Sequence, residues 1–91
     1  MIAKREIDGI QIAGWTSSER WRDGIRHLVF IHGSGGDHTH WAYQYGDLKN
    51  DFNVLAVDLP GHGQSEGNGE RSVDAYVDWT RKILAGFEVE K

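Results

Sequence analysis

The stretch from Leu28 to Gly36 constrains the fold more than any other part of the chain. It begins with an apolar run that is too short for a helix, and it turns into a glycine-rich loop. A parallel strand that is covered on both faces contains continuous rather than alternating apolar residues. Ligands of open α/β sheets bind just beyond the carboxyl ends of such strands. The sequence therefore predicts a buried strand over His27–His32 and a functional site near Ser34.

The length and composition predict one small globular domain over residues 1–91. Hydrophobic residues make up 38% of the 91 residues and four are tryptophan, which is more than a disordered chain contains. The net charge is −4 without long runs of like charge, so neither nucleic acid nor a membrane is an expected partner. The chain has no cysteine, which excludes disulfides and thiol nucleophiles. It shows no signal core and no apolar run of spanning length, so a cytoplasmic location is expected by default.

Two β-capable segments, Ile2–Ile7 and Ile10–Trp15, precede the glycine loop. Asp8-Gly9 between them is a dipeptide that suits a type I′ turn, because both of its residues tolerate a left-handed backbone. The polar segment Thr16–Arg26 contains further turn signals. These features predict an antiparallel hairpin and a connecting loop before the strand over His27–His32.

A helix is predicted between the glycine loop and a second apolar run. Apolar residues recur at positions 41, 45 and 48, which is helical spacing, and they predict a short helix over His40–Asn50 with Asp37 or Thr39 as its cap. Phe52–Leu59 then reads as a strand that ends at the turn dipeptide Pro60-Gly61. A strand, a helix and a strand in this order predict a βαβ unit whose strands lie parallel.

A second helix is predicted after the glycine-rich loop Gly61–Arg71. Ser72 is a suitable N-cap for it. One predicted face carries the apolar residues, which pack on the sheet. The members of this face are Val73, Tyr76, Val77, Thr80, Leu84 and Phe87.

Two motifs at the ends of the predicted strands resemble those of the α/β-hydrolase superfamily. One is His32-Gly33-Ser34-Gly35-Gly36, followed by Trp41, and the other is Asp58-Leu59-Pro60-Gly61-His62-Gly63-Gln64-Ser65. Both occur in the order of the family, with a crossover helix between them and a hairpin before them. The chain resembles the amino-terminal part of a single such domain. The implied fold class is α/β, as a partial α/β-hydrolase sheet built from the hairpin, the βαβ unit and a further helix.

This resemblance implies an oxyanion-hole role for the loop that follows the strand. The backbone N–H of Ser34 would stabilise the negative charge of a tetrahedral intermediate, Gly33 would let the backbone approach, and His32 would orient the loop. Gly35 and Trp41 are candidates for contact with substrate. The loop has no proline and so departs from the His-Gly-x-Pro variant of epoxide hydrolases and haloalkane dehalogenases. The resemblance thus favours an esterase-like hydrolase that acts on a small acyl substrate (ester, thioester or amide) without a cofactor.

A nucleophile is not identified in the chain. Gly63-Gln64-Ser65-Glu66-Gly67 matches the Gly-x-Ser-x-Gly pattern, but no strand precedes it and no histidine follows position 62. We interpret Ser65 as a loop serine, and the resemblance places the nucleophile, the acid and the histidine after Lys91. The alternative is a non-catalytic fragment or subunit that associates with a second chain. In the family a further strand pairs with the strand over 28–31, so we also expect self-association through this edge.

A metal site is the competing interpretation of the histidines. Asp37-His38-Thr39-His40 lies close in sequence to His32 and His62, and zinc needs three or four such ligands. The known hydrolase pattern His-x-His-x-Asp-His is absent, and neighbouring residues at a helix start usually diverge. We therefore predict solvated capping groups and no metal, with Asp58 as a support for its turn. Trp41 and Tyr45, at helical spacing, are predicted to belong mainly to the core.

Overall fold

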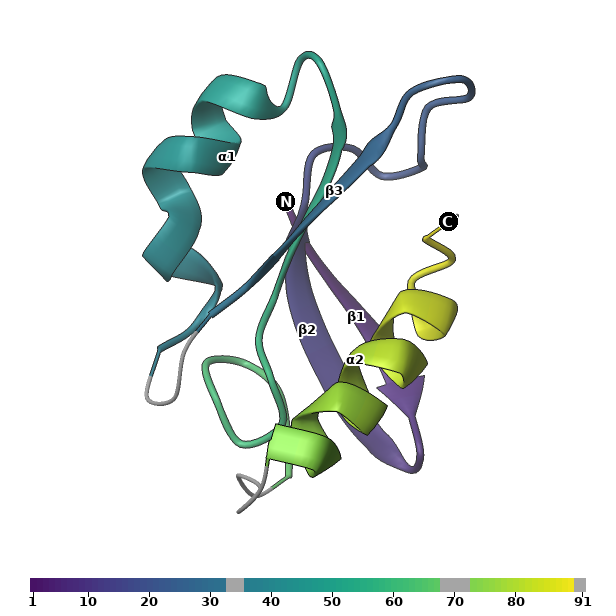
Figure 1. Cartoon of the computed structure of the whole chain (residues 1–91), viewed down its shortest axis with the longest axis vertical. Helices are drawn as coiled ribbons and strands as arrows, with labels where there is room; N and C mark the ends of the chain where they lie inside the picture. The colour runs from purple at the N-terminus through teal and green to yellow at the C-terminus, as the bar shows by residue number, and fades with distance from the viewer. Residues whose placement is uncertain (33–35, 68–72, 90–91) are drawn as a thin grey trace.

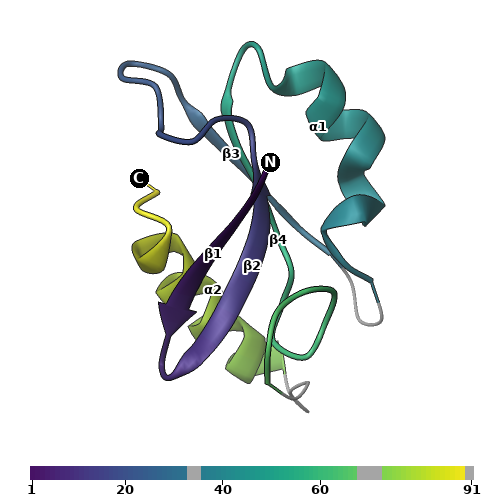
Figure 2. The same cartoon turned by 180° about the vertical axis from the view of Figure 1, so that it is seen from behind.

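A computed structural model describes residues 1–32, 36–67 and 73–89 of the chain. Its centre is a four-stranded sheet with the strand order β1-β2-β4-β3. Figures 1 and 2 show helix α1 on one face of this sheet and helix α2 on the other. This mixed sheet between helices confirms the predicted α/β class.

The hairpin forms as its turn dipeptide predicts. Strands β1 (Ile2–Ile7) and β2 (Ile10–Thr16) pair antiparallel, with Ile7 opposite Ile10. Asp8 and Gly9 have φ values of 52° and 82°, the left-handed backbone that a type I′ turn requires. The hairpin therefore depends on two residues that accept this conformation.

Strands β3 (His27–Ile31) and β4 (Asn53–Val57) lie parallel, which confirms the βαβ unit. Both are shorter than the sequence predicts, because residues 32, 52, 58 and 59 fall outside the ladder. On its other side, β4 pairs antiparallel with β2. All five residues of β4 are buried, as expected for a strand with a neighbour on each side and a helix on each face.

The predicted helix over His40–Asn50 is wrong in its boundaries. The helical segment begins with a 3₁₀ turn, η1 (His38–Trp41), and continues as the short helix α1 (Ala42–Leu48). Asp37 fixes the start, because its carboxylate accepts the backbone N–H of Thr39, and this confirms one of the two predicted caps.

Helix α2 (Val73–Gly86) covers the opposite face, and the predicted cap Ser72 lies outside the described residues. Its apolar face is rotated from the predicted one. Ile83, which the prediction missed, is fully buried, whereas Val77 is 45% exposed. Phe87 and Ile83 pack with Leu55 and the other core residues of this face, which are Ile7, Ile12, Val57 and Leu59. Within the described ranges, no helix is long and apolar enough to cross a membrane.

Candidate functional site

The candidate site lies where the parallel strands β3 and β4 end. Because the two strands are parallel, the chain leaves both at the same end of the sheet, which is the lower end of the molecule in Figures 1 and 2. This is the position at which open α/β sheets bind their ligands. Of the predicted site residues, His32 and Trp41 are described, whereas Gly33, Ser34 and Gly35 lie outside the described residues.

His32 connects the end of β3 to the end of β4. Its side chain is buried, and its Nε2 accepts the backbone N–H of Leu59 at 3.0 Å. A neutral ring that accepts at Nε2 carries its proton on Nδ1. The ring of His62 lies beside it, with 4.9 Å between centroids. This geometry suits the orienting role that the family resemblance implies for His32.

Asp58 binds the two loops to each other. The residue is fully buried, and its carboxylate accepts the backbone N–H of His38 at 2.5 Å and that of Gln64 at 3.0 Å. The Nδ1 atom of His38 lies 2.8 Å and 3.0 Å from the two carboxylate oxygens. A buried carboxylate needs such donors because it has lost its water. The predicted role of Asp58 as a turn support is confirmed, and it extends to a second loop.

The prediction that His38 is a solvated capping group is wrong. Its side chain is buried because the Asp58 carboxylate draws both its ring and its backbone N–H inward. Sequence reasoning missed this pair, since the two residues lie 20 positions apart. The available signal was their placement, because each follows a predicted parallel strand and such strands end at the same edge of the sheet.

Gly63 makes the Asp58 contacts possible. Its φ is +49°, and a Cβ atom at this position would lie 2.5 Å from the carboxylate carbon of Asp58. Only glycine therefore lets the loop pass close enough for the Gln64 N–H to reach the carboxylate.

Ser65 lies in this loop, as predicted, and its hydroxyl serves the backbone. The Oγ atom accepts the N–H of Ala13 at 2.8 Å and donates to the carbonyl of Asp58 at 2.5 Å. Two further hydrogen bonds join Glu66 to Gln11. The backbone N–H of Gln11 donates to the carboxylate of Glu66, and the backbone N–H of Glu66 donates to the carbonyl of Gln11. The second motif is thus anchored on β2, and these contacts explain why a Gly-x-Ser-x-Gly match occurs here without a nucleophile elbow.

Charge near the site shifts two ionisable groups. The hydroxyl and the backbone N–H of Thr39 both donate to Asp37, and they lower the pKa of its carboxyl below the ordinary range. Burial raises the pKa of the Tyr45 hydroxyl, and the negative charges of Asp37 and Asp58 add to this shift. The site is therefore an environment of negative charge on the side that faces α1.

Asp37, His38 and Asp58 are the described residues whose ligand atoms could hold a metal ion, since these atoms lie within 4.8 Å of one another. Two of them belong to the sequence motif that suggests a metal, whereas Asp58 does not. The oxygens of Asp58 already accept N–H donors from the protein. These hydrogen bonds occupy the lone pairs that a metal would use, so the donor set suits a structural link between the loops better than a metal.

Two aromatic residues of the helical segment, Trp41 and Tyr45, contribute to the core, as predicted. Tyr45 is buried and stacks on Trp15, with 4.1 Å between ring centroids. Trp41 is half-buried and stacks on Phe30 at 5.4 Å. The first contact holds α1 against β2, and the second holds η1 against β3.

Two of the curated proteins that the chain resembles show the range of its relatives. The chain is 40% identical over 60 residues to the dihydrolipoyllysine-residue acetyltransferase component of the acetoin cleaving system of Cupriavidus necator, an alignment that covers 66% of this chain and 15% of that protein. It is 37% identical over 68 residues to the 2-succinyl-6-hydroxy-2,4-cyclohexadiene-1-carboxylate synthase of Shigella dysenteriae, over 75% of this chain and 27% of that protein. The chain thus spans about a quarter or less of the length of these relatives.

The comparison of structures and the family model both point to the same fold. The structure of a candidate lipase from Acinetobacter baumannii superposes with a TM-score of 0.86 at 18% identity, over 99% of this chain and 30% of that one, which shows a shared fold. The family model described as the alpha/beta hydrolase family matches residues 28–89, which is more than half of the chain. The resemblance of the two motifs is therefore confirmed, and the chain belongs to the alpha/beta hydrolase family.

Proposed function

We propose that this chain supplies the oxyanion loop of an α/β hydrolase that hydrolyses an ester, thioester or amide bond through a serine nucleophile. The observation that carries the proposal is the connection between the two loops at the ends of β3 and β4. His32 holds Leu59, and Asp58 holds His38, so the residues on both sides of positions 33–35 are fixed to the same loop. The nucleophile, the acid and the catalytic histidine would come from residues beyond Lys91.

Fixed anchors are what an oxyanion hole requires. A backbone N–H stabilises developing negative charge only when it is oriented before the charge forms. In the proposed mechanism the nucleophile attacks the substrate carbonyl, and the carbonyl oxygen becomes an oxyanion that the Ser34 N–H stabilises. Such a donor contributes about 3–4 kcal/mol to transition-state stabilisation. His32 would take no part in proton transfer, because its Nε2 is used by Leu59.

The names of the two curated relatives point to different types of reaction. The name of the Cupriavidus protein is that of an acyl-transfer enzyme, which supports acyl chemistry for the present chain. The name of the Shigella protein is that of a synthase. An experiment on the function must therefore test the oxyanion donor directly as well as the substrate.

The decisive experiment removes the proposed donor in a protein that carries this chain together with a nucleophile elbow. Ser34→Pro deletes the backbone N–H, and we expect kcat for a small ester to fall about 10²–10³-fold. Ser34→Ala keeps the N–H, and it should change kcat by no more than a few-fold. Steady-state kinetics with a 4-nitrophenyl ester measures both variants, and circular dichroism verifies that they fold. Equal losses in the two variants would contradict the proposed role.

A further inference from the structure

Two Asp-Gly dipeptides occur among the described residues, Asp8-Gly9 in the hairpin and Asp23-Gly24 in the loop before β3. A glycine after an aspartate leaves its backbone nitrogen accessible, because it has no Cβ atom. In water this nitrogen can attack the side-chain carboxyl group of the aspartate. The same reaction is therefore open to both dipeptides, and their surroundings decide which of them reacts.

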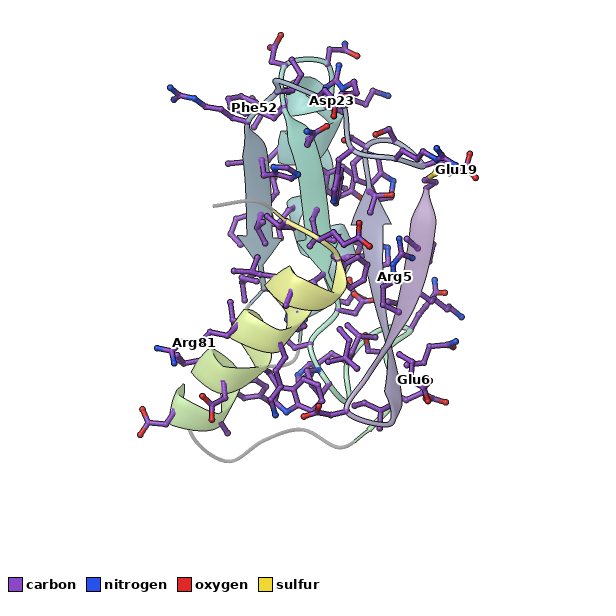
Figure 3. The ribbon with its side chains drawn as sticks, turned by 90° about the vertical axis from the view of Figure 1, so that its right-hand side faces the viewer. Arg5, Glu6, Glu19, Asp23, Phe52 and Arg81 are labelled. Atoms are coloured by element: carbon purple, nitrogen blue, oxygen red, sulfur yellow. The ribbon has the colours of Figure 1, made fainter. Side chains whose placement is uncertain are left out.

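Asp23 and Gly24 form the exposed tip of a turn whose two ends are held from inside the protein. The side chain of Asn53, which is fully buried, accepts the N–H of Arg22 at 2.9 Å. It donates to the carbonyl of Arg22 at 2.9 Å and to that of Ile25 at 3.0 Å. Within the described part of the chain, no hydrogen bond holds the Asp23 carboxylate or the Gly24 N–H. Figure 3 shows Asp23 at the upper end of the molecule, opposite to the candidate site.

The peptide group between Asp23 and Gly24 can rotate while the ends of the turn stay in place. Gly24 has a φ of +76°, which is close to the value for the third residue of a type II turn. Types I and II differ mainly in the orientation of this central peptide, and glycine accepts a φ of either sign. Rotation toward type I turns the nitrogen of Gly24 and lets it approach the carboxyl group of Asp23.

Asp8-Gly9 lacks this freedom. Its φ values of 52° and 82° belong to a type I′ turn, and a turn of type I or II would splay the two strands. The pairing of Ile7 with Ile10 directly beside the turn therefore opposes rotation of the central peptide. The carboxylate of Asp8 is also bonded to the Nζ of Lys82 at 2.5 Å, and an attack on it must first break this ion pair.

We propose that Asp23 is a site of spontaneous isomerisation and that Asp8 is protected from it. The nitrogen of Gly24 forms a bond to the side-chain carboxyl carbon of Asp23, whose C–OH bond breaks. The hydroxyl leaves with the proton of the nitrogen as water, and a cyclic imide remains. Water then adds to the imide carbonyl of the main chain, the C–N bond of that carbonyl breaks, and the nitrogen regains a proton. The product is isoaspartate, and because one water is lost and one is taken up, the mass of the chain is unchanged.

The modification should loosen the start of both parallel strands. Isoaspartate lengthens the main chain between Arg22 and Ile25 by one methylene group, so the three side-chain bonds of Asn53 to these residues cannot all persist. Asn53 is also the first residue of β4, and its N–H donates to the carbonyl of Arg26 just before β3. The proposed site consists of residues 22–26 and Asn53, so it does not depend on the chemistry proposed for the loop after β3.

Peptide mapping of the purified chain tests the proposal after incubation at neutral pH and physiological temperature. Trypsin separates the two dipeptides, because Arg20 and Arg22 lie between them. An isoaspartyl peptide keeps its mass but elutes separately and is identified by its fragmentation. We expect isoaspartate to accumulate at Asp23 at least ten-fold faster than at Asp8. The modified chain should unfold at a lower urea concentration than the unmodified chain.

Two variants test the cause of the difference. Asp23→Glu keeps the charge but requires a larger ring, and it should remove the signal at this position. Lys82→Met removes the ion pair and should raise the rate at Asp8 about two- to five-fold, a small factor because an exposed ion pair contributes little. The rate at Asp23 should stay the same in Lys82→Met, which makes this position an internal control.

Two results on the wild-type chain would overturn the proposal. One is isomerisation at Asp8 that is as fast as at Asp23. The other is an unreactive Asp23 in the folded chain under conditions in which a synthetic peptide of residues 20–27 isomerises. Both are measured without a substitution, so they stand even if a variant does not fold. The Asn68-Gly69 dipeptide lies outside the described residues, and its deamidation changes the mass of its peptide, so it is not confused with either signal.

Discussion

At the scale of single residues, Asp58 determines how the site is held. Its carboxylate is the shared acceptor for the loop that follows β3 and for the loop that follows β4. The sequence marks Asp58 only as a polar residue at a strand end. The burial of its partner His38 was not predicted, because it depends on a carboxylate that the fold brings from another segment, and the only signal was that both residues follow parallel strands.

Asp58→Asn should destabilise the protein. The amide that replaces one oxygen is a donor, and it would face an N–H of His38 or Gln64 that then loses its acceptor. A buried donor left without a partner costs about 1–3 kcal/mol. Urea unfolding measures the change, and Asp51→Asn at an exposed position is the control, with an expected change within about 0.5 kcal/mol. Similar losses in both variants would show that the Asp58 contacts do not stabilise the fold.

The contribution of Asp37 to the stability of the fold should decrease as the pH falls. Because Thr39 lowers the pKa of this carboxyl in the folded state, unfolded chains bind its proton more readily. Its stabilising contribution is therefore present above the ordinary aspartate pKa of about 3.9, and it is lost as the pH falls through the lower folded-state value. Thr39→Val removes the hydroxyl donor, and the pKa of Asp37 should rise toward the ordinary value. A carboxyl-detected NMR titration measures this, and an unchanged pKa would contradict the assigned cause.

At the scale of elements, local rules predict which segments become helices and strands better than they predict which side chains become buried. Asp8-Gly9 requires a left-handed turn, and this is enough to predict the hairpin. Spacing alone predicts a face of α2 that is rotated from the observed one, in which Ile83 is buried in place of Val77. The reason is physical, because the sheet under α2 selects the face that is buried, and the helix sequence has apolar residues on more than one side.

Two glycine substitutions should have opposite effects on stability. Gly46 lies in α1 with open space where a methyl group would be added, so Gly46→Ala should stabilise the protein by about 0.5–1 kcal/mol through a smaller loss of backbone entropy. Gly14 lies in β2, where a Cβ would come within 2.8 Å of Leu55 and 3.3 Å of the Ala56 carbonyl. Gly14→Ala should therefore destabilise it by about 1–3 kcal/mol. Thermal unfolding of the two variants measures both changes, and a shift of the same sign in both would refute the packing argument.

At the scale of the whole molecule, the sequence alone predicts more of the sheet than of the candidate site. The order of motifs along the chain led to the family and to the βαβ unit, since each motif follows a strand. The connections that hold the site (His32 to Leu59, Asp58 to His38 and Ser65 to Ala13) join residues that are distant in sequence. Such contacts follow from the assembled sheet and carry no local signal.

The purified 91-residue chain should not hydrolyse esters above the background rate. The hydroxyl of Ser65 is bonded to the backbone of Ala13 and Asp58, so it is not held by a general base. Release of 4-nitrophenol from its acetate ester measures the rate, and the Ser65→Ala chain is the control. A rate above background that the substitution abolishes would show that Ser65 is a nucleophile after all.

The strand order has a consequence for how the chain reaches its native state. Strand β4 lies between β2 and β3, although both of these precede it in the sequence. The hairpin can form early because its contacts are local, whereas β2 and β3 have no neighbour in common until residues 53–57 are available. Closing such long loops before any contact is gained slows folding. Insertion of β4 is thus the step that commits the chain to its fold, and until then the apolar edges of β2 and β3 are open to aggregation.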